Sequence, residues 1–380
     1  MIMEKKETQL DEILSYEQPT RYIVSSSNYT KDKSDTPVLT AGKTFILGYT
    51  KEKQGIFQNK LPVIIFDDFT TAIKLVDFPF KVKSSAMKIL SVDTSKADVR
   101  YIYYAMQNIH FSVRKHKRHW ISEYSKIKIM LPPLAEQKRI ADMLSKVFID
   151  IENSIQKTRQ NSKLSSKTTY SELLSTFNDD TLKTYLLEDV CDTTSGGTPS
   201  RSIKSYYDGD ISWLKSGELN DNRSISSSEE HISEDAIKKS NAKVFPSGTV
   251  LLAMYGATVG KLGILSANAS TNQAVCAITP HKNILNEYMF WYLYFYRDEL
   301  VKKAFGGAQP NISQTLIRKL PVKIPLKDNQ PDLAKQKEIV AKVNTIQEKQ
   351  EKLMDLFSRQ EKLFASLRSS VLNQSFQMQT

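Results

Sequence analysis

The chain has 380 residues, 40% of them hydrophobic, so it is long enough for two or three folded domains and too apolar to be disordered. Its formal net charge of +11 indicates a polyanionic partner, and nucleic acid is favoured over membrane because the sequence has neither an apolar 18-residue run nor a basic amphipathic helix. The only two cysteines, Cys191 and Cys276, have no metal-ligand spacing, and the first residues are charged where a signal peptide needs an apolar core, so we expect a reduced, cytoplasmic location.

In chain order, the pattern predicts a globular segment at 1–133, a helix at 134–178, a second globular segment at 179–332 and a second helix at 333–380. In the first globular segment we expect strands at 38–47, 63–66, 73–82 and 89–92, then a helix at 99–109. In the second we expect strands at 211–214, 249–254, 260–265 and 274–278, then a helix at 288–303. Each globular segment is therefore predicted to be a mixed α/β or α+β domain.

The two halves of the chain are repeats. Residues 134–140 (LAEQKRI) return as 333–339 (LAKQKEI), and the same offset of 199 pairs like residues through to the ends of both helices, without a gap. A second offset, 187, relates the globular segments and pairs Val63 with Val250 and Tyr101 with Tyr288. The change of offset means that the globular segments have gained or lost loop residues. The helices pair without any gap, which indicates that their length is constrained.

Apolar residues recur in a 4-3 spacing, as in a coiled coil, along the second helix and at the start of the first, in which the pattern weakens at 157–169. Neither helix can bury such a stripe alone, so we expect the two to pack on each other, antiparallel, with an approximate two-fold relation between the repeats. Gln350 and Gln360 interrupt the stripe and are candidates to fix its register. The predicted seam residues are Ile140, Leu144, Val147, Ile151, Ile339, Val343, Ile346, Leu353, Phe357, Phe364 and Leu367.

Several loops carry candidate DNA contacts. The basic run at 114–119 would neutralise phosphates, although a solvated loop is the alternative. One hydroxyl–lysine pair follows a strand in each globular segment, Thr71 with Lys74 and Thr258 with Lys261, and the alternative there is an ordinary tight turn. Arg201, in a glycine-rich loop, suits guanine, and an amide pair near 310 suits adenine or, alternatively, ends a helix. The candidates are Lys43, Thr71, Lys74, Arg114, Lys115, Lys117, Arg118, Thr198, Ser200, Arg201, Tyr255, Gly256, Thr258, Lys261, Gln309 and Asn311.

The sequence offers little for catalysis. Asp67 and Asp68 could hold a nuclease metal, but no Glu-x-Lys follows, so loop ordering or acceptance of a cytosine amine is favoured. His116 and His119 lack a third metal ligand and lie among cations. Neither a cofactor-binding glycine loop nor a methyl-transfer motif is present. The aromatic run at 288–296 is more typical of a core helix than of a base-stacking platform.

Several motifs in this order are similar to those of one known family, the specificity subunits of type I restriction-modification systems. The motifs are the helix starts after Pro132 and Pro325, Trp213, and the runs 195–200 (SGGTPS), 255–261 (YGATVGK), 271–274 (TNQA) and 306–312 (GGAQPNI). The resemblance covers nearly the whole chain. The first globular segment departs from it, with Phe66 to Thr71 where the second has a glycine-rich turn.

The resemblance implies two target-recognition domains that read a bipartite double-stranded DNA site, spaced by two helices. It implies partners as well: two methyltransferase subunits, with restriction subunits left open, and no membrane. It implies a non-catalytic chain that binds no cofactor or metal, because S-adenosylmethionine, Mg and ATP are used by the partner subunits. Two other functions stay open, a coiled-coil adaptor that binds only protein and a stand-alone DNA-modifying enzyme.

Overall fold

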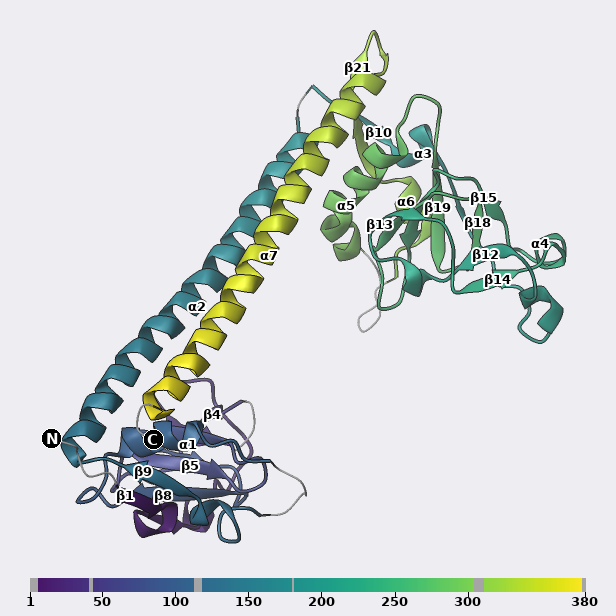
Figure 1. The fold of residues 1–380 in the computed structure, drawn as a ribbon. Coiled ribbons are helices and arrows are strands. Elements are labelled where there is room, and N and C mark those ends of the chain that lie inside the picture. Colours follow the sequence, from purple (N-terminus) through teal and green to yellow (C-terminus); the bar gives the residue numbers. More distant parts are fainter. Residues whose placement is uncertain (1–5, 41–43, 113–117, 180, 304–310, 378–380) are drawn as a thin grey trace. The chain divides into compact units, whose positions relative to one another are not determined.

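The structure is a computed structural model that describes residues 6–40, 44–112, 118–179, 181–303 and 311–377 (Figure 1). It divides into two compact units, the first made of Met1–Arg159 and Ser358–Thr380 and the second of Gln160–Phe357. The long helices α2 (Leu134–Phe177) and α7 (Leu333–Gln377) each contribute to both units. Each unit therefore contains one globular segment, the start of the helix that follows it and the end of the other helix.

The first globular segment has two sheets, and strand β5 (Val63–Asp67) of the first sheet is buried on both faces. Ile64 and Phe66 pack in the cluster that includes α1 (Val99–Gln107), whereas Val63 and Ile65 pack in the cluster of the second sheet. This alternation follows from the two-residue period of a strand. The antiparallel sheet has the order β2 (Leu14–Glu17), β8 (Met87–Val92), β5 and β6 (Ile73–Val76), and the second has β4 (Ile46–Thr50), β3 (Thr36–Leu39) and β7 (Lys81–Val82).

The second globular segment has the same arrangement, with one more strand in each sheet. Helix α5 (Asn286–Lys302) packs in the same cluster as one face of the first sheet, and the other face packs with the second sheet. The first sheet has the order β11 (Cys191–Ser195), β19 (Val275–Pro280), β16 (Val250–Ala253), β17 (Leu262–Leu265) and β13 (Asn222–Ile225). The second has the order β14 (Glu230–Ile232), β12 (Ile211–Leu214), β18 (Ala269–Thr271) and β15 (Val244–Phe245).

Short elements complete both segments. Strand β1 (Lys6–Gln9) pairs with β9 (Lys128–Leu131), and β10 (Lys183–Leu186) pairs with β20 (Pro321–Ile324). In each segment the first strand is therefore paired with a strand that shortly precedes a long helix. The remaining elements are β21 (Leu326–Lys327), β22 (Gln330–Pro331), α3 (Leu187–Val190), α4 (Glu234–Lys239), α6 (Gln314–Arg318) and the 3-10 turns η1 (Leu10–Glu12), η2 (Pro19–Tyr22), η3 (Tyr124–Lys126), η4 (Lys204–Tyr207) and η5 (Ser216–Glu218).

The repeat predicted from the sequence is confirmed element by element. Strands β2, β8, β5 and β6 of the first segment are neighbours in the same order as β11, β19, β16 and β17 of the second. The predicted match of Tyr101 with Tyr288 extends to their hydrogen bonds: the Tyr101 hydroxyl donates to the Met130 carbonyl over 2.8 Å and the Tyr288 hydroxyl to the Lys323 carbonyl over 2.7 Å. The two units therefore share one architecture.

A buried glutamine joins each globular segment to its helix. The Gln137 side chain accepts a hydrogen bond from the Asp98 amide over 2.9 Å and donates to the Pro132 carbonyl over 2.8 Å. Gln336, its repeat partner, accepts from the Leu285 amide over 2.8 Å and donates to the Asn283 carbonyl over 2.9 Å. Both side chains are almost fully buried, so each satisfies backbone groups that water does not reach. This explains why glutamine occupies the same position of both LAxQK motifs.

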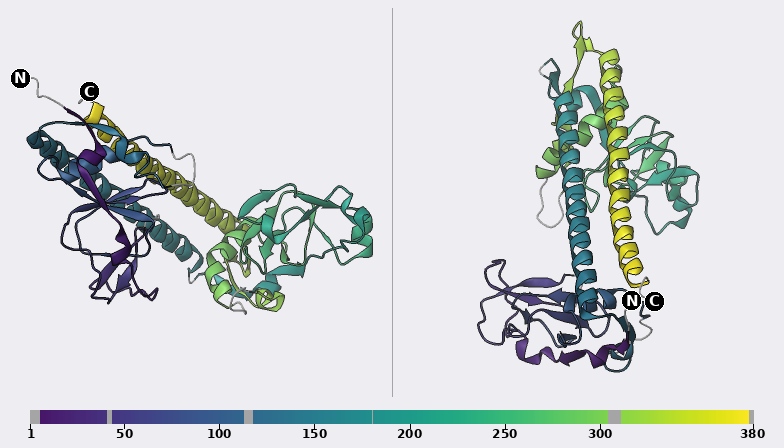
Figure 2. Two further views of the ribbon diagram at one scale, coloured as in Figure 1. Left: turned by 90° about the horizontal axis from the view of Figure 1, so that it is seen from below. Right: turned by 60° about the vertical axis from the view of Figure 1, so that its left-hand side comes forward.

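The two long helices run antiparallel, side by side in the three views (Figures 1 and 2). In the second unit the Thr169 hydroxyl donates to Gln350 and Ser162 contacts Met354, so the residue number rises along one helix as it falls along the other. In the first unit the Thr158 hydroxyl donates to Gln360 over 3.2 Å. These contacts support the predicted role of Gln350 and Gln360 in fixing the register. The part of α2 in which the apolar pattern is weak presents serine and threonine side chains to these glutamines.

Most of the predicted seam is buried or half-buried, and one member is wrong. Ile140, Leu144, Ile151, Ile339 and Val343 are buried, but Leu367 is 48% exposed. A straight α-helix drifts by about 20° per heptad from a strict 3.5-residue repeat, so a stripe counted from Ile339 has left the contact face by the fourth heptad. Val371, the next residue of the same 4-3 count, does pack in the cluster of the first segment, together with Leu372 and Phe376. The half-buried members are Val147, Ile346, Leu353, Phe357 and Phe364.

Two predicted strands of the first segment are also corrected. The run 38–47 is divided between β3, which ends at Leu39, and β4, which begins at Ile46. The run 73–82 is divided between β6 and β7, which belong to different sheets. Pro79 lies between them, and because proline has no backbone N–H it cannot continue a central strand. The helices predicted at 99–109 and 288–303 are confirmed as α1 and α5.

Candidate nucleic-acid interface

The glycine-rich loop of the second segment is held tightly at its base. A Cβ on Gly196 would lie 2.1 Å from the Thr271 carbonyl oxygen, so no larger residue fits there without moving the backbone. The indole N–H of Trp213, which is buried, donates to the Gly197 carbonyl over 2.9 Å. The loop therefore leaves a rigid base before it reaches the exposed candidates Thr198, Ser200 and Arg201, and the Thr198 hydroxyl donates to the side chain of Gln273.

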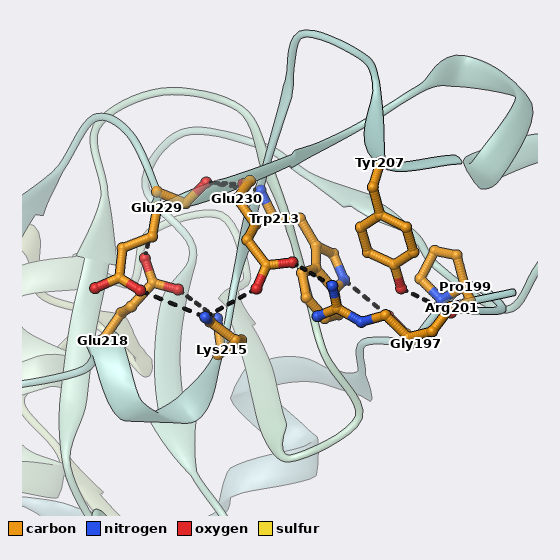
Figure 3. Close-up of polar contacts among 10 residues, drawn as sticks. Gly197, Pro199, Arg201, Tyr207, Trp213, Lys215, Glu218, Glu229 and Glu230 are labelled. Atoms are coloured by element: carbon orange, nitrogen blue, oxygen red, sulfur yellow. Dashed lines mark hydrogen bonds and ion pairs between the residues drawn. The ribbon is translucent and has the colours of Figure 1, made fainter. Parts of the chain in front are cut away.

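Arg201 lies in a network of rings and carboxylates at the surface (Figure 3). Its guanidinium is 4.2 Å from the Tyr207 ring centroid, and its Nη1 donates to Glu230 Oε2 over 2.6 Å. Lys215 Nζ donates to the other oxygen of Glu230 over 2.9 Å. These two bonds lower the pKa of Glu230 to about 2, so this carboxylate stays ionised at neutral pH. Arg201 is thus a fixed cation, with its side chain still 54% exposed.

The other predicted pair in the second segment is engaged within the fold. The Thr258 hydroxyl donates to the Ser216 carbonyl over 2.9 Å, and Lys261 Nζ lies 2.9 Å from an Asp221 carboxylate oxygen. Gly256 and Gly260 adopt φ of +85° and +79°, which L side chains rarely adopt, so they permit this turn. Thr258 and Lys261 therefore stabilise the turn. DNA contact by either residue, or by the half-buried Tyr255 and the exposed Gly256, stays a prediction.

The corresponding turn of the first segment presents its lysine to solvent. Thr71 adopts φ of +59°, and its amide donates to the Asp67 carbonyl over 2.9 Å. Lys74 is exposed, and within the part of the chain that the structure describes no ion pair reaches it. Lys74 lines a groove of about 720 Å³, and Arg368 of α7 lines the same groove. Arg368 is a cation next to this site that the sequence reasoning missed, because its proximity depends on the packing of α7.

The two aspartates of the first segment order loops, as the sequence favoured. Asp67 accepts hydrogen bonds from the backbone amides of Phe69 and Thr70, and Asp68 accepts from the Trp120 amide over 2.9 Å. Asp68 also lies 3.3 Å from the buried Lys88 ammonium. Both aspartates are buried, so neither is placed to accept a cytosine amine. Among the described residues, no group of three side chains is arranged to hold a metal ion.

Several sequence candidates fall at or beyond the edge of the described ranges. Lys43, Arg114, Lys115, Lys117 and Gln309 lie outside the described residues. Arg118 is described and exposed, and the next residue, the buried His119, ties this end of the basic run to the fold because its amide donates to the Asp68 carbonyl over 2.9 Å. Asn311 is exposed and forms a β-bridge with Tyr255.

The structure adds a polar pocket that the sequence predicted only in part. Its volume is about 530 Å³, and Asn241, Lys243 and Gln273 line it together with the loop at 195–198. Amide and ammonium side chains are the groups that read base edges. Gln273 belongs to a motif that the sequence singled out, but no local pattern marked Asn241 or Lys243, which reach the loop only through the tertiary fold.

The aromatic run of the second segment is core, as the sequence favoured. Tyr288, Phe290, Trp291 and Phe295 are buried in the main cluster, where Phe177 of α2 packs against Tyr288 at a ring distance of 5.5 Å. Burial raises the pKa of Tyr292 to about 12. These buried rings are therefore not available to stack on nucleic-acid bases, whereas Tyr294 and Tyr296 are half-buried. Over the described residues, no helix has the length and apolarity that crossing a membrane requires.

Comparison with known proteins gives one consistent result. The family model described as "Type I restriction modification DNA specificity domain" matches residues 3–161 and 179–354. The Escherichia coli type I restriction enzyme EcoR124I/EcoR124II specificity subunit is 34% identical over 359 residues, which are 89% of this chain and 86% of that protein. The Methanocaldococcus jannaschii MjaIX specificity subunit is 30% identical over 153 residues, 39% of this chain and 35% of that protein.

Solved structures agree on the fold. A chain from a study of complex assembly and conformational transition of the type I R-M system superposes with a TM-score of 0.73 at 16% identity, covering 99% of both chains. The HsdS subunit from Thermoanaerobacter tengcongensis superposes with a TM-score of 0.57 at 16% identity, covering 98% of this chain and 96% of that one. At these identities the likeness concerns the fold alone.

Proposed function

This chain belongs to the type I restriction-modification DNA specificity family, and we propose that it is the subunit that selects the DNA target of such a complex. The observation that carries the proposal is the duplication of one globular segment on two paired helices. Two different recognition surfaces on one chain suit a target with two different specified blocks, as two identical subunits suit a palindrome. Each globular segment would read one block of double-stranded DNA.

The two recognition surfaces are unlike in charge and shape, which favours two different blocks. In the first, Lys74 and Arg368 line one groove, and the second has Arg201 held by Glu230 and the polar pocket at Gln273. The net charge of +11 favours binding along a phosphate backbone. In this role the chain supplies binding and positioning, and the partner subunits supply methyl transfer with S-adenosylmethionine.

The helices carry matched apolar residues that favour two docked methyltransferase subunits. Leu164 is 63% exposed and Leu363 is 69% exposed, and they are repeat partners at the offset of 199. A single exposed leucine is common on protein surfaces, so it is the repetition of the same exposed residue type at the same position of both helices that favours docking. Each unit would then have one docking position, and each docking position would bind one methyltransferase subunit.

The decisive experiment maps adenine methylation across the genome of cells that carry this chain with its methyltransferase, and of cells that lack only this chain. We expect one bipartite motif, with two short specified blocks and a fixed gap, to lose methylation in the second strain. An unchanged pattern in cells that contain both proteins would contradict the proposal and favour an adaptor that binds only protein. Methylation or cleavage by the purified chain alone would favour a stand-alone enzyme.

The fixed length of the helices predicts a fixed gap between the blocks. Seven residues inserted between 157 and 169 of α2, matched by seven between Gln350 and Gln360 of α7, would keep the helix faces in register. They lengthen both helices by about 10 Å, which corresponds to roughly three base pairs of DNA. We expect the same two blocks with a longer gap in the methylation map. If methylation persists with the original gap, the helices do not set the spacing.

A further inference from the structure

We infer that Arg201 reads a guanine in the block recognised by the second globular segment, and that Glu230 is the positioning residue that presents Arg201 to it. The inference rests on the proposed function and names a base and a pair of residues within it. Three properties of the site carry it: the guanidinium is held in one orientation, part of it is left free, and the surrounding charge disfavours a phosphate (Figure 3).

Arg201 is held by groups that are themselves fixed to its own loop. Its guanidinium stacks on Tyr207, at 4.2 Å, and lies 5.1 Å from the Trp213 ring. The Tyr207 hydroxyl donates to the Pro199 carbonyl over 2.7 Å, and the Trp213 indole donates to the Gly197 carbonyl over 2.9 Å. The rings and the loop that carries Arg201 therefore form one rigid body. A guanidinium held in this way loses less rotamer freedom when it binds.

The ion pair with Glu230 leaves donors available. A guanidinium has five N–H donors, and the bond to Glu230 uses Nη1. The side chain remains 54% exposed. Arginine recognises guanine by donating two parallel hydrogen bonds to O6 and N7 in the major groove, which requires one free edge of the guanidinium in a fixed plane. Arg201 meets both requirements.

The charges around Arg201 favour a base over a phosphate. Glu230 contacts both Arg201 and Lys215, Glu229 contacts the Lys215 ammonium, and Glu218 accepts from the Lys215 amide, so three carboxylates accompany two cations (Figure 3). Lys215 Nζ lies 3.4 Å from Glu229 and 2.9 Å from Glu230. A phosphate would meet this excess of negative charge at close range, whereas the major-groove edge of guanine is neutral and offers acceptors only. The network therefore selects the kind of contact that carries sequence information.

Glu230 is fixed from both sides as well. One carboxylate oxygen accepts from Arg201 and the other from Lys215, so Glu230 cannot rotate without breaking a bond. Replacing Glu230 by glutamine keeps the size of the side chain but removes the charge that holds the guanidinium. The loop, the rings and Lys215 would remain. A change at Glu230 should thus act on the precision of the Arg201 contact and leave the fold in place.

The test uses the complete complex of this chain with its methyltransferase, carrying R201K, E230Q or, as a matched control, E234Q. Glu234 forms an ion pair of 2.9 Å with Lys238 in the same globular segment, at the exposed helix α4. Methylation rates are measured on the mapped target and on all single-base variants of both blocks. We expect R201K and E230Q to reduce discrimination by about tenfold at one G·C pair of one block, with the other block unaffected, and E234Q to change nothing.

Two outcomes would overturn the inference. One is full discrimination at every position by both R201K and E230Q, and the other is a second block that specifies no G·C pair. If E230Q lost all methylation, R201K would decide, because it keeps the positive charge and loses only the forked geometry. Failure of the proposed function looks different, since no bipartite motif would then depend on this chain at all.

Discussion

The two globular segments are alike where they meet the helices and unlike where they present side chains to a ligand. Gln137 and Gln336 make equivalent bonds, and Tyr101 and Tyr288 donate to equivalent carbonyls. In contrast, Lys74 is exposed while its repeat partner Lys261 is paired with Asp221. The contacts that join each globular segment to its helix are therefore the same in both units, because the two helices are repeats of each other. The recognition surfaces are free to differ, because each segment reads its own target.

The largest expected effect concerns the ends of the helices, where the match between the units is incomplete. Phe177 is 2% exposed and contacts Tyr288, Tyr292 and Phe295. Its repeat partner Phe376 is half-buried and contacts Tyr101 at 5.5 Å. We expect F177A to lower the free energy of unfolding by about 4 kcal/mol and F376A by roughly half as much, in urea titrations of the whole chain.

Leu356→Ala is the control for these truncations, because Leu356 is 58% exposed and its loss should change stability by less than about 0.5 kcal/mol. Equal losses from F177A and F376A would show that the two helix ends are packed equally well, against the burial seen here.

The buried glutamines Gln137 and Gln336 should contribute equally to the stability of the two units. Q137L and Q336L each leave backbone groups buried without a partner, at a cost of about 2 kcal/mol in the free energy of unfolding. Q156L is the matched control, because Gln156 is exposed and bonds only to Glu152 among the described contacts. A loss in only one of the two variants would mean that the shared motif has different roles in the two units.

The matched leucines should bind partners independently. We expect L164D and L363D each to remove one methyltransferase subunit from the complex, and the double variant to remove both, as seen in masses from native mass spectrometry. An aspartate in an apolar contact should lower the affinity for each methyltransferase subunit by about tenfold or more. Leu356→Asp is the control, because Leu356 is exposed but its repeat partner is Lys157. Full occupancy in the double variant would place docking elsewhere.

The smallest effect separates the two turn lysines. K74Q should lower the slope of log affinity against log salt by about 0.9, because Lys74 is exposed and forms no ion pair with any described residue, so its contact with phosphate releases a counterion. K261Q should change the slope less, because Lys261 is already paired with Asp221, a carboxylate that it shares with Arg297. K362Q, at an exposed position of α7, is the control. Binding of the complex to its mapped target at several salt concentrations gives the slopes, and equal slopes for K74Q and K261Q would remove the distinction.

The sequence by itself determined the parts of this protein that depend on local pattern and on repetition. The 4-3 spacing located both long helices, and the two offsets related the halves down to Tyr101 and Tyr288, because the same contacts impose the same residue types twice. The aromatic helix was also assigned correctly to the core from its neighbours in the chain, whereas for Asp67 and Asp68 the sequence left loop ordering and acceptance of a cytosine amine open. A strict heptad count failed at Leu367, since the drift of a straight helix accumulates over distance.

Only the tertiary structure decided which polar groups share a surface. Arg201 and Glu230 are 29 residues apart, and Lys74 and Arg368 are almost 300 apart, yet each pair occupies one site. It also decided that Lys261 is paired with Asp221, whereas no described residue forms an ion pair with Lys74. Loop residues obey no periodicity, so the sequence can name a basic side chain there but cannot show its partner. That depends on how strands distant in the chain are brought together.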